Sequence, residues 1–342
     1  TDAGLAFRMT QAGQQALLAS FSPSGGHGPA FALTRTSEGL IYGTTELGGT
    51  NGVGTVFSLN ADGTLRQSVS MENAKGGWPS SPLVAVGDGT FLGLARQGGA
   101  LGYGAIYRFA TNGVISLVAS FGQTNGASPC GAVYLDAAGN LYGTTRTGGT
   151  SDVGALFRVN TTNGTITRLA SFNSNTGYNP EAGLMHGQDG VFYGSTYYGG
   201  TYGVGAVFRY TTNGGLSALA SFNPTNLGSY GRSTLVQGSN GLLYGTTFFG
   251  TSGTYGTLFR VATNGTIAKQ APFYDQKYPV GPLTFGPGGA IYGMTLNERF
   301  QYGTVFCAWT NRAIVSTLML VNIGEGPYGG GIWDGSNRLY GT

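Results

Sequence analysis

Short apolar runs recur along this chain and are separated by turns rich in glycine. In one representative stretch the runs cover residues 129–135, 140–145, 155–159 and 165–172. Runs of this length, in a chain with abundant Thr, Tyr and Phe, are typical of β-strands. No stretch has the 3.6-residue period of an amphipathic helix, so the pattern predicts an all-β protein.

The arrangement repeats every 48 to 51 residues and is marked by versions of Tyr-Gly-Thr-Thr. The copies begin at Tyr42, Leu92, Tyr142, Tyr193, Tyr244, Tyr292 and Tyr340. The last turn of a repeat is usually Asn-Gly, as at Asn163-Gly164, which suits a tight hairpin. One four-stranded sheet per repeat would be marginal alone, whereas radial packing buries both faces. We therefore predict a seven-bladed β-propeller with four antiparallel strands per blade.

The two ends of the chain carry complementary halves of a repeat. Residues 4–21 match the outer two strands of the unit, and residues 327–342 match the inner two. Pairing these halves would close the ring, whereas an open superhelix would leave bare sheet edges. We expect one domain over residues 1–342, with blade 7 split between residues 1–21 and 321–342.

Composition narrows the class of function. Charged residues are 9% of the chain and the formal net charge is +3, so nothing indicates a nucleic-acid partner. No run approaches the roughly 20 apolar residues of a membrane span. The two histidines, His27 and His186, occupy different points of the repeat, so we expect neither a metal site nor a cofactor. His186 is interpreted as a hydrogen-bonded core residue.

Other repeated or rare residues are interpreted as structural. Cys130 and Cys307 lie at different points of different repeats, which predicts two buried, unpaired thiols rather than a disulfide. An arginine recurs in the third strand of most repeats, too regularly to mark a single site. Its copies are Arg8, Arg108, Arg158, Arg209 and Arg260.

Three motifs of the repeat carry a family resemblance. They are Gly-x-Leu-Tyr-Gly-Thr-Thr, Gly-Gly-Thr-x-x-x-Gly-Thr/Ala-Val-Phe-Arg and a closing Leu-Ala-Ser-Phe, clearest at residues 139–158, 190–209 and 39–57. In these motifs the chain resembles the GloVer-type tandem repeat of secreted bacterial proteins with a variety of C-terminal anchors. It departs at Leu92, Leu94 and Ala95, and where Glu298-Arg299 replaces a Gly-Gly pair. The resemblance implies a secreted or cell-surface location and no particular activity, because the repeat is a scaffold.

With this strand order, the loops after strands two and four of each repeat share one face of the ring. These loops vary most between repeats, and such variation is where a scaffold carries function. Aromatic residues crowd the sector of repeats four to six. The residues that we expect to bind a ligand on this face are Trp78, Tyr178, Tyr197, Tyr198, Tyr230, Phe248, Phe249, Tyr278, Arg146 and Arg232.

Two interpretations of these aromatic residues remain open. They can fill the gaps between blades, as large apolar side chains commonly do. Alternatively, they form a platform on which sugar rings stack while neighbouring polar groups bind the hydroxyls. Packing alone would repeat in all seven copies, so the confinement of these residues to one sector favours the platform.

Catalysis on the same face is a further hypothesis. Candidate catalytic residues are Glu181, Arg232, Asp275, Glu298 and Tyr328. A glycoside hydrolase needs two carboxyl groups about 5–10 Å apart, for which Glu325 is a further candidate. A uronate lyase would need a Tyr or His base, such as Tyr230 or His27, beside an arginine. For Glu181 and Arg232, which occupy equivalent positions on neighbouring blades, we favour a plain ion pair at the channel mouth.

The sequence thus predicts a propeller that binds a polysaccharide or another extracellular polymer, and the family resemblance implies that it is bacterial and secreted or on the cell surface. The alternatives are a polysaccharide lyase or glycoside hydrolase that uses the same face, and a surface structural protein. We expect a monomer or a head-to-tail assembly.

Overall fold

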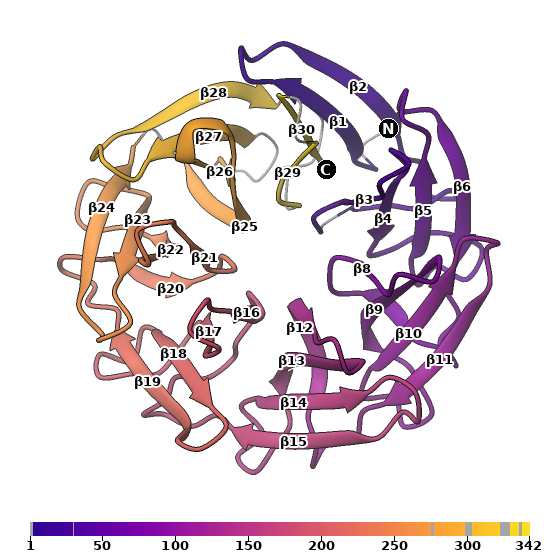
Figure 1. Cartoon of the computed structure of the whole chain (residues 1–342), viewed down its shortest axis with the longest axis horizontal. Coiled ribbons are helices and arrows are strands. Elements are labelled where there is room, and N and C mark those ends of the chain that lie inside the picture. Colours follow the sequence, from indigo (N-terminus) through magenta and orange to yellow (C-terminus); the bar gives the residue numbers. More distant parts are fainter. Residues whose placement is uncertain (1–2, 30, 275–276, 298–302, 322–328, 335–336) are drawn as a thin grey trace.

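Seven sheets surround a central axis in the computed structural model, which describes residues 3–29, 31–274, 277–297, 303–321, 329–334 and 337–342 (Figure 1). Each sheet is antiparallel and extends from an inner strand near the axis to an outer strand at the rim. In blades 2 and 5 the inner strand is broken into two short pieces. The predicted seven-bladed propeller with four antiparallel strands per blade is confirmed.

The first four blades follow one another along the chain, each from its inner to its outer strand. Blade 1 contains β3 (Thr34–Arg35), β4 (Ile41–Thr45), β5 (Thr55–Leu59) and β6 (Leu65–Ser70). Blade 2 contains β7 (Gly77–Pro79), β8 (Val84–Ala85), β9 (Thr90–Gln97), β10 (Ala105–Ala110) and β11 (Ile115–Ser120). Blade 3 contains β12 (Ala127–Leu135), β13 (Asn140–Thr147), β14 (Ala155–Asn160) and β15 (Ile166–Ser171). Blade 4 contains β16 (Met185–His186), β17 (Phe192–Ser195), β18 (Ala206–Thr211) and β19 (Gly215–Ser221).

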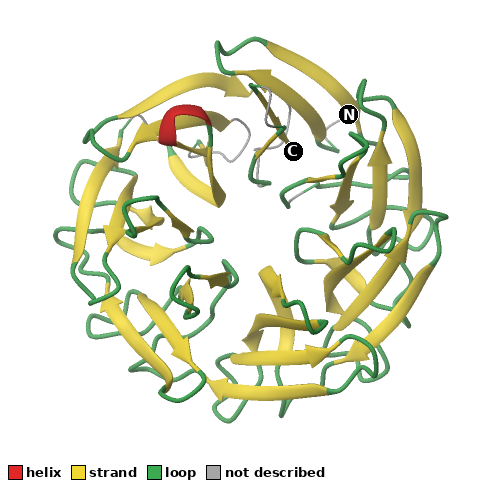
Figure 2. Ribbon diagram, viewed as in Figure 1, coloured by secondary structure: helices red, strands yellow, loops and turns green. Residues whose placement is uncertain are grey.

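The remaining blades include the one that joins the chain ends. Blade 5 contains β20 (Ser229–Gly231), β21 (Val236–Gln237), β22 (Leu243–Phe249), β23 (Gly256–Val261) and β24 (Ile267–Phe273). Blade 6 contains β25 (Tyr278–Phe285), β26 (Ala290–Leu296), β27 (Gly303–Trp309) and β28 (Val315–Val321). Blade 7 contains β29 (Ile332–Trp333), β30 (Arg338–Gly341), β1 (Leu5–Thr10) and β2 (Gln15–Ser20). Within the described residues the single helical segment is the 3-10 turn η1 (Pro287–Gly289) between β25 and β26 (Figure 2).

Backbone pairing between the chain ends closes the ring. Strand β1 runs antiparallel to β30, with Phe7 opposite Gly341 and Thr10 opposite Arg338. Blade 7 therefore takes its outer strands from the N-terminal segment and its inner strands from the C-terminal segment. The predicted closure is confirmed, and it removes the open edges that a superhelix would expose.

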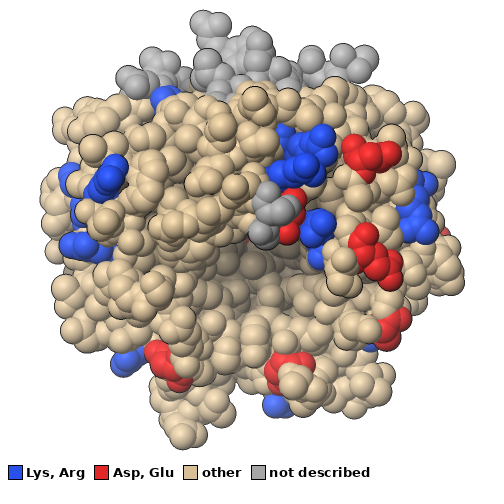
Figure 3. Space-filling model, turned by 45° about the horizontal axis from the view of Figure 1, so that its top comes forward, with Lys and Arg blue, Asp and Glu red and all other residues tan. Residues whose placement is uncertain are grey.

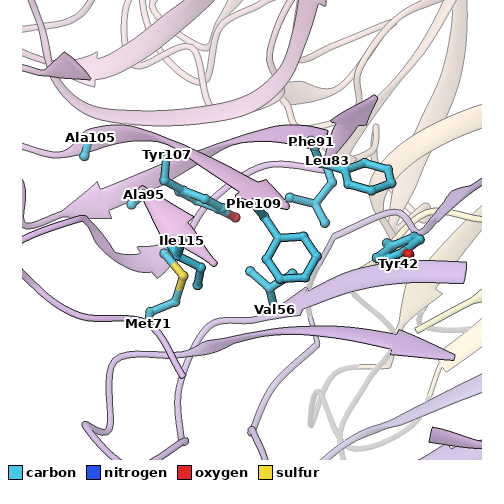
Figure 4. Packing of buried hydrophobic residues seen from close by; sticks show 10 residues of the cluster. All are labelled: Tyr42, Val56, Met71, Leu83, Phe91, Ala95, Ala105, Tyr107, Phe109 and Ile115. Carbon is cyan, nitrogen blue, oxygen red and sulfur yellow. The ribbon is translucent and has the colours of Figure 1, made fainter. Parts of the chain in front are cut away.

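Large apolar side chains fill the spaces between neighbouring blades. In one such cluster Tyr42 from β4 lies against Phe91 and Phe109 of blade 2, at ring-centroid distances of 4.4 and 6.1 Å (Figure 4). Full burial of a side chain of this kind contributes about 1.5–3 kcal/mol. The tyrosine of the repeat motif thus joins one blade to the next, which accounts for its regular recurrence.

The register of the second and third strands explains the repeated arginine. Arg158 lies opposite Tyr142, and Arg209 opposite Tyr193, while the same pairing joins Arg8 to Tyr340 across the closure. Such cross-strand neighbours stabilise a sheet. This register agrees with the structural role predicted for the arginine column.

Two expectations about single residues have different outcomes. Cys130 and Cys307 are both free and buried, as predicted. The interpretation of His186 as a core residue is wrong, because its side chain is exposed. It is the last residue of the two-residue strand β16, and its ring stacks on Tyr134 of the neighbouring blade at a centroid distance of 4.3 Å.

Candidate functional site

The loops after the second and fourth strands of each blade meet on one face, which we call the loop face. His27, in the loop that leads into blade 1, donates its backbone N–H to the carbonyl of Leu47, between β4 and β5, at 2.8 Å. Tyr178 and Tyr198 make the corresponding contact in blade 4 at 2.9 Å. The hairpins that join the first to the second strand and the third to the fourth lie at the opposite ends of these strands, on what we call the hairpin face.

The backbone of the loop face is held in an unusual conformation at one position of the repeat. Four non-glycine residues there have positive φ: Trp78 (59°), Ser128 (53°), Asn179 (52°) and Tyr230 (63°). This conformation costs about 1 kcal/mol or more per residue. Each donates its N–H to the preceding blade; Trp78 bonds to Val53 at 2.7 Å and Tyr230 to Val204 at 2.8 Å. These inter-blade bonds hold the loop-face side chains on a rigid backbone.

A cavity of about 500 Å³, which we call the mouth pocket, lies at the centre of the loop face. Figure 3 shows a hollow in the molecule with acidic and basic side chains gathered along one side of it. The charged residues among those described as lining the pocket come from five consecutive blades: Glu46, Arg96, Arg146, Glu181 and Arg232. Other polar groups in the lining are His27, Cys130, Thr234 and Thr342.

The charged groups of the mouth pocket are joined by ion pairs. Glu46 pairs with Arg96, whose Nη2 lies 3.2 Å from Oε1. Glu181 accepts two arginines: Nε of Arg146 at 3.2 Å and Nη2 of Arg232 at 3.5 Å. The ion pair that we favoured for Glu181 and Arg232 is therefore present, with Arg146 as an additional partner.

Burial raises the pKa of two groups in this lining. It raises the pKa of the Glu46 carboxyl, although the positive charge of Arg96 opposes the rise. Burial, reinforced by the negative charge of Glu181, raises the pKa of the Cys130 thiol to about 12. Cys130 therefore lines the pocket as a neutral thiol rather than as a reactive thiolate.

Arg232 connects the mouth pocket to the aromatic sector. Its guanidinium carbon lies 5.6 Å from the ring centroid of Tyr197 and 4.9 Å from that of Phe248. Both distances are within the range of cation–π attraction. One side chain thus contacts Glu181, Tyr197 and Phe248, which come from separate segments of blades 4 and 5.

Seven rings form a continuous arrangement across blades 4 to 6, which we call the aromatic belt. Its members are Tyr178, Tyr197, Tyr198, Tyr230, Phe248, Phe249 and Tyr278. Tyr197 stacks on Tyr230 at 4.6 Å, and Phe248 stacks on Tyr278 at 5.0 Å. The link between these pairs is Phe249, whose ring meets Tyr230 edge-on at 5.7 Å.

Exposure differs sharply between adjacent members of the belt. Phe248 is 6% exposed, whereas its neighbour Phe249 is 41% exposed. Tyr197 is half-buried, and Tyr198 is 37% exposed. Phe248 and Tyr197 therefore pack between blades, whereas Phe249 and Tyr198 present ring surface to solvent.

The other predicted residues are distributed as follows. Arg146 lines the mouth pocket, whereas Trp78 stands in blade 2 and belongs neither to the belt nor to the described pocket lining. Four candidates fall outside the described residues: Asp275, Glu298, Glu325 and Tyr328. Our sequence predictions missed Glu46 and Arg96 as site residues. Their positions in the repeat could have identified them, because both occupy the position of Arg146, directly after the buried part of the second strand.

Neither metal-binding clusters nor spanning helices are found in the part of the chain that the structure describes. No group of three His, Cys, Asp or Glu side chains there is arranged to hold a metal ion. Within the same ranges, no helix has the length and apolar character needed to cross a membrane.

Solved structures with the same fold come from several bacteria. A periplasmic gluconolactonase of Pseudomonas aeruginosa is 16% identical, with a TM-score of 0.61 and 99% coverage of both chains. A putative 6-phosphogluconolactonase of Bacteroides fragilis is 15% identical, with a TM-score of 0.61 and coverage of 96% of this chain and 98% of that one.

The extracellular domain of a putative one-component system from B. thetaiotaomicron is 12% identical, with a TM-score of 0.61. The match covers 92% of this chain, which spans 37% of that one. At these identities the similarity shows the fold alone. No curated protein matches the sequence.

One protein family matches over the whole length. The Gloeobacter/Verrucomicrobia repeat family matches residues 1–203 and, in a second overlapping stretch, residues 183–342. The resemblance read from the repeat motifs is thereby confirmed, and the chain belongs to the Gloeobacter/Verrucomicrobia repeat family.

Proposed function

We propose that this protein is a secreted or cell-surface bacterial propeller that binds an extracellular polysaccharide across its loop face. The aromatic belt is the platform and the mouth pocket is its polar end. The observation that carries this proposal is the exposure of Tyr198 and Phe249 on a belt whose other rings hold them in place.

The chemistry of the belt suits a sugar. The apolar face of a pyranose stacks on an aromatic ring, while its hydroxyl groups need donors and acceptors close by. Tyr198 meets Tyr197 edge-on at 4.7 Å, and Phe249 meets Phe248 in the same way at 5.0 Å. Because these rings are already ordered, binding loses little side-chain entropy.

The proposed location has separate support. The family resemblance implies export, and similar folds are described as extracellular in B. thetaiotaomicron and periplasmic in P. aeruginosa. The gluconolactonase and 6-phosphogluconolactonase descriptions of other similar folds agree with a carbohydrate-related role.

A double variant tests the platform. In Tyr198→Ala/Phe249→Ala, affinity for a polysaccharide selected from a glycan panel is expected to fall about 10- to 100-fold, since one aromatic contact contributes roughly 0.5–1.5 kcal/mol beyond its buried area. The matched control is Leu65→Ala/Val114→Ala, which removes exposed apolar side chains from the hairpin face. Equal binding by wild type and both variants, measured by isothermal titration calorimetry, would reject the platform.

Bond cleavage in the mouth pocket is the second candidate function. Glu46 and Glu181 line the same cavity, and a carboxyl group with a raised pKa is suited to act as a general acid. The same panel tests this function if products are analysed after incubation. New reducing ends or unsaturated uronates that disappear in Glu46→Gln would establish it, and intact polymer would exclude it.

A further inference from the structure

We propose that the mouth pocket binds the carboxylate of an acidic sugar, so that the polymer on the loop face contains uronic acid units. This inference rests on the proposed function and names the chemical class of the unit that enters the pocket. The residues that carry it are Arg96, Arg146 and Arg232, three guanidinium groups that line one cavity.

The charges of the described lining do not balance. Among the charged side chains, three arginines lie with two glutamates, Glu46 and Glu181, which leaves one positive side-chain charge in excess. The Cys130 thiol, which also lines the pocket, keeps its proton because burial raises its pKa. A ligand with a single negative charge would neutralise the excess, whereas a dianion would meet two carboxylates.

Arg146 is the arginine best placed to supply that charge. Its side chain is 49% exposed, compared with 35% for Arg232 and 34% for Arg96. It contacts Glu181 through Nε, and its terminal nitrogens have no partner within the described part of the chain. A guanidinium donates two parallel N–H bonds to a carboxylate, so this free end matches a planar, singly charged group.

The other two arginines are more firmly committed to the protein. Arg96 points Nη2 at Glu46. Arg232 lies over the rings of Tyr197 and Phe248 and also reaches Glu181. Arg232 therefore belongs to the belt and to the pocket at once. A sugar polymer that stacks on the belt therefore reaches the carboxylate-binding arginines where the belt meets the pocket.

Matched polymers provide the test. We would measure binding of polygalacturonate, of the same polymer after carboxyl reduction to galactose units, and of free galacturonate, by isothermal titration calorimetry. The proteins are wild type, Arg146→Gln and Arg158→Gln. The last variant removes an exposed arginine from the same blade, outside the described pocket lining, and controls for overall charge. Glu181 retains Arg232 in Arg146→Gln, and near-ultraviolet circular dichroism verifies that this variant is folded.

We expect wild type to bind polygalacturonate at least about tenfold more tightly than the reduced polymer, since a charge-assisted hydrogen bond has roughly this effect. We expect Arg146→Gln to lose most of that difference and Arg158→Gln to keep it. Equal binding of both polymers would overturn the carboxylate site while leaving the aromatic platform intact. Absence of polymer binding would reject the platform, and the carboxylate site would then be tested with free galacturonate. Galacturonate binding that Arg146→Gln abolishes would support the site. Absence of galacturonate binding would overturn it. Tighter binding of a sulfated polymer than of polygalacturonate would also overturn it.

Discussion

The two faces of the ring are built from different kinds of contact. On the hairpin face many turns are closed locally, by an Asn or Asp side chain that accepts the backbone N–H two residues later. Thr165 donates to Asn163 at 3.0 Å, and Thr266 donates to Asn264 at 2.9 Å. On the loop face, local turns are joined by bonds between separate blades, as between Trp78 and Val53. A local turn repeats because it depends on its own residues, whereas the side-chain contacts between blades differ from one blade to the next.

The exposed apolar residues follow the same division. The exposed aromatic residues among those described lie in the connections of the loop face: Tyr103, Tyr198, Tyr202, Phe249 and Tyr274. Those at the ends of the outermost hairpins are aliphatic: Leu65, Val114 and Ile314. Contact of aromatic surface with water is unfavourable, and exposed aromatic residues are common where a protein binds a partner. The regular face therefore supports the fold, and the irregular face is the one suited to recognition.

A glycine on each face gives the largest expected contrast in stability. Gly177 (φ 86°, loop face) and Gly190 (φ 77°, hairpin face) both have the left-handed backbone, so alanine strains each by about 1 kcal/mol. The added methyl at Gly177 also collides with the side chain of buried Thr196, whereas that at Gly190 meets nothing. We expect Gly177→Ala to lower the free energy of unfolding by about 2–4 kcal/mol and Gly190→Ala by about 1. Equal losses in urea titrations would show that the loop face is no more tightly packed than the hairpin face.

Substitution of two arginines is expected to give a difference in stability of intermediate size. Arg232→Ala removes two cation–π contacts and one partner of Glu181, so we expect a loss of about 1–2 kcal/mol in unfolding free energy. Arg209, an exposed member of the repeated column, makes one 3.3 Å hydrogen bond to Ser217, and Arg209→Ala is expected to cost less than about 0.5 kcal/mol. If urea denaturation gave the reverse order, the role of Arg232 in connecting the belt to the pocket would be wrong.

The smallest expected effect depends on pH. Because burial raises the pKa of Glu46, the folded state keeps a proton at pH values where the unfolded chain has lost it. The contribution of Glu46 to stability therefore falls as pH rises above the ordinary carboxyl pKa of about 4.3. Glu46→Gln cannot titrate, so its unfolding free energy relative to wild type should increase slightly between about pH 4 and pH 7. A constant difference in thermal unfolding across this range would contradict the raised pKa.

Several features of the site were readable from residue spacing. The equivalent positions of Glu181 and Arg232 on neighbouring blades predicted their ion pair, which the structure contains. The shared face of the two loop sets followed from strand order. The contact of Arg146 with Glu181 was not predicted, because it joins the second strand of blade 3 to the segment before the inner strand of blade 4, and its length depends on how closely these blades approach.

The motif period, the hairpin turns and the split repeat at the ends were sufficient to predict a closed ring of seven sheets. This is possible because strand formation and hairpin turns depend on residues close together in the chain, and identical units add up to one architecture. The packing of the ring determines which of two adjacent aromatic residues is covered, as with Phe248 and Phe249, and which carboxylate each arginine meets. These outcomes depend on the distance and angle between blades, where side chains far apart in sequence compete for the same space.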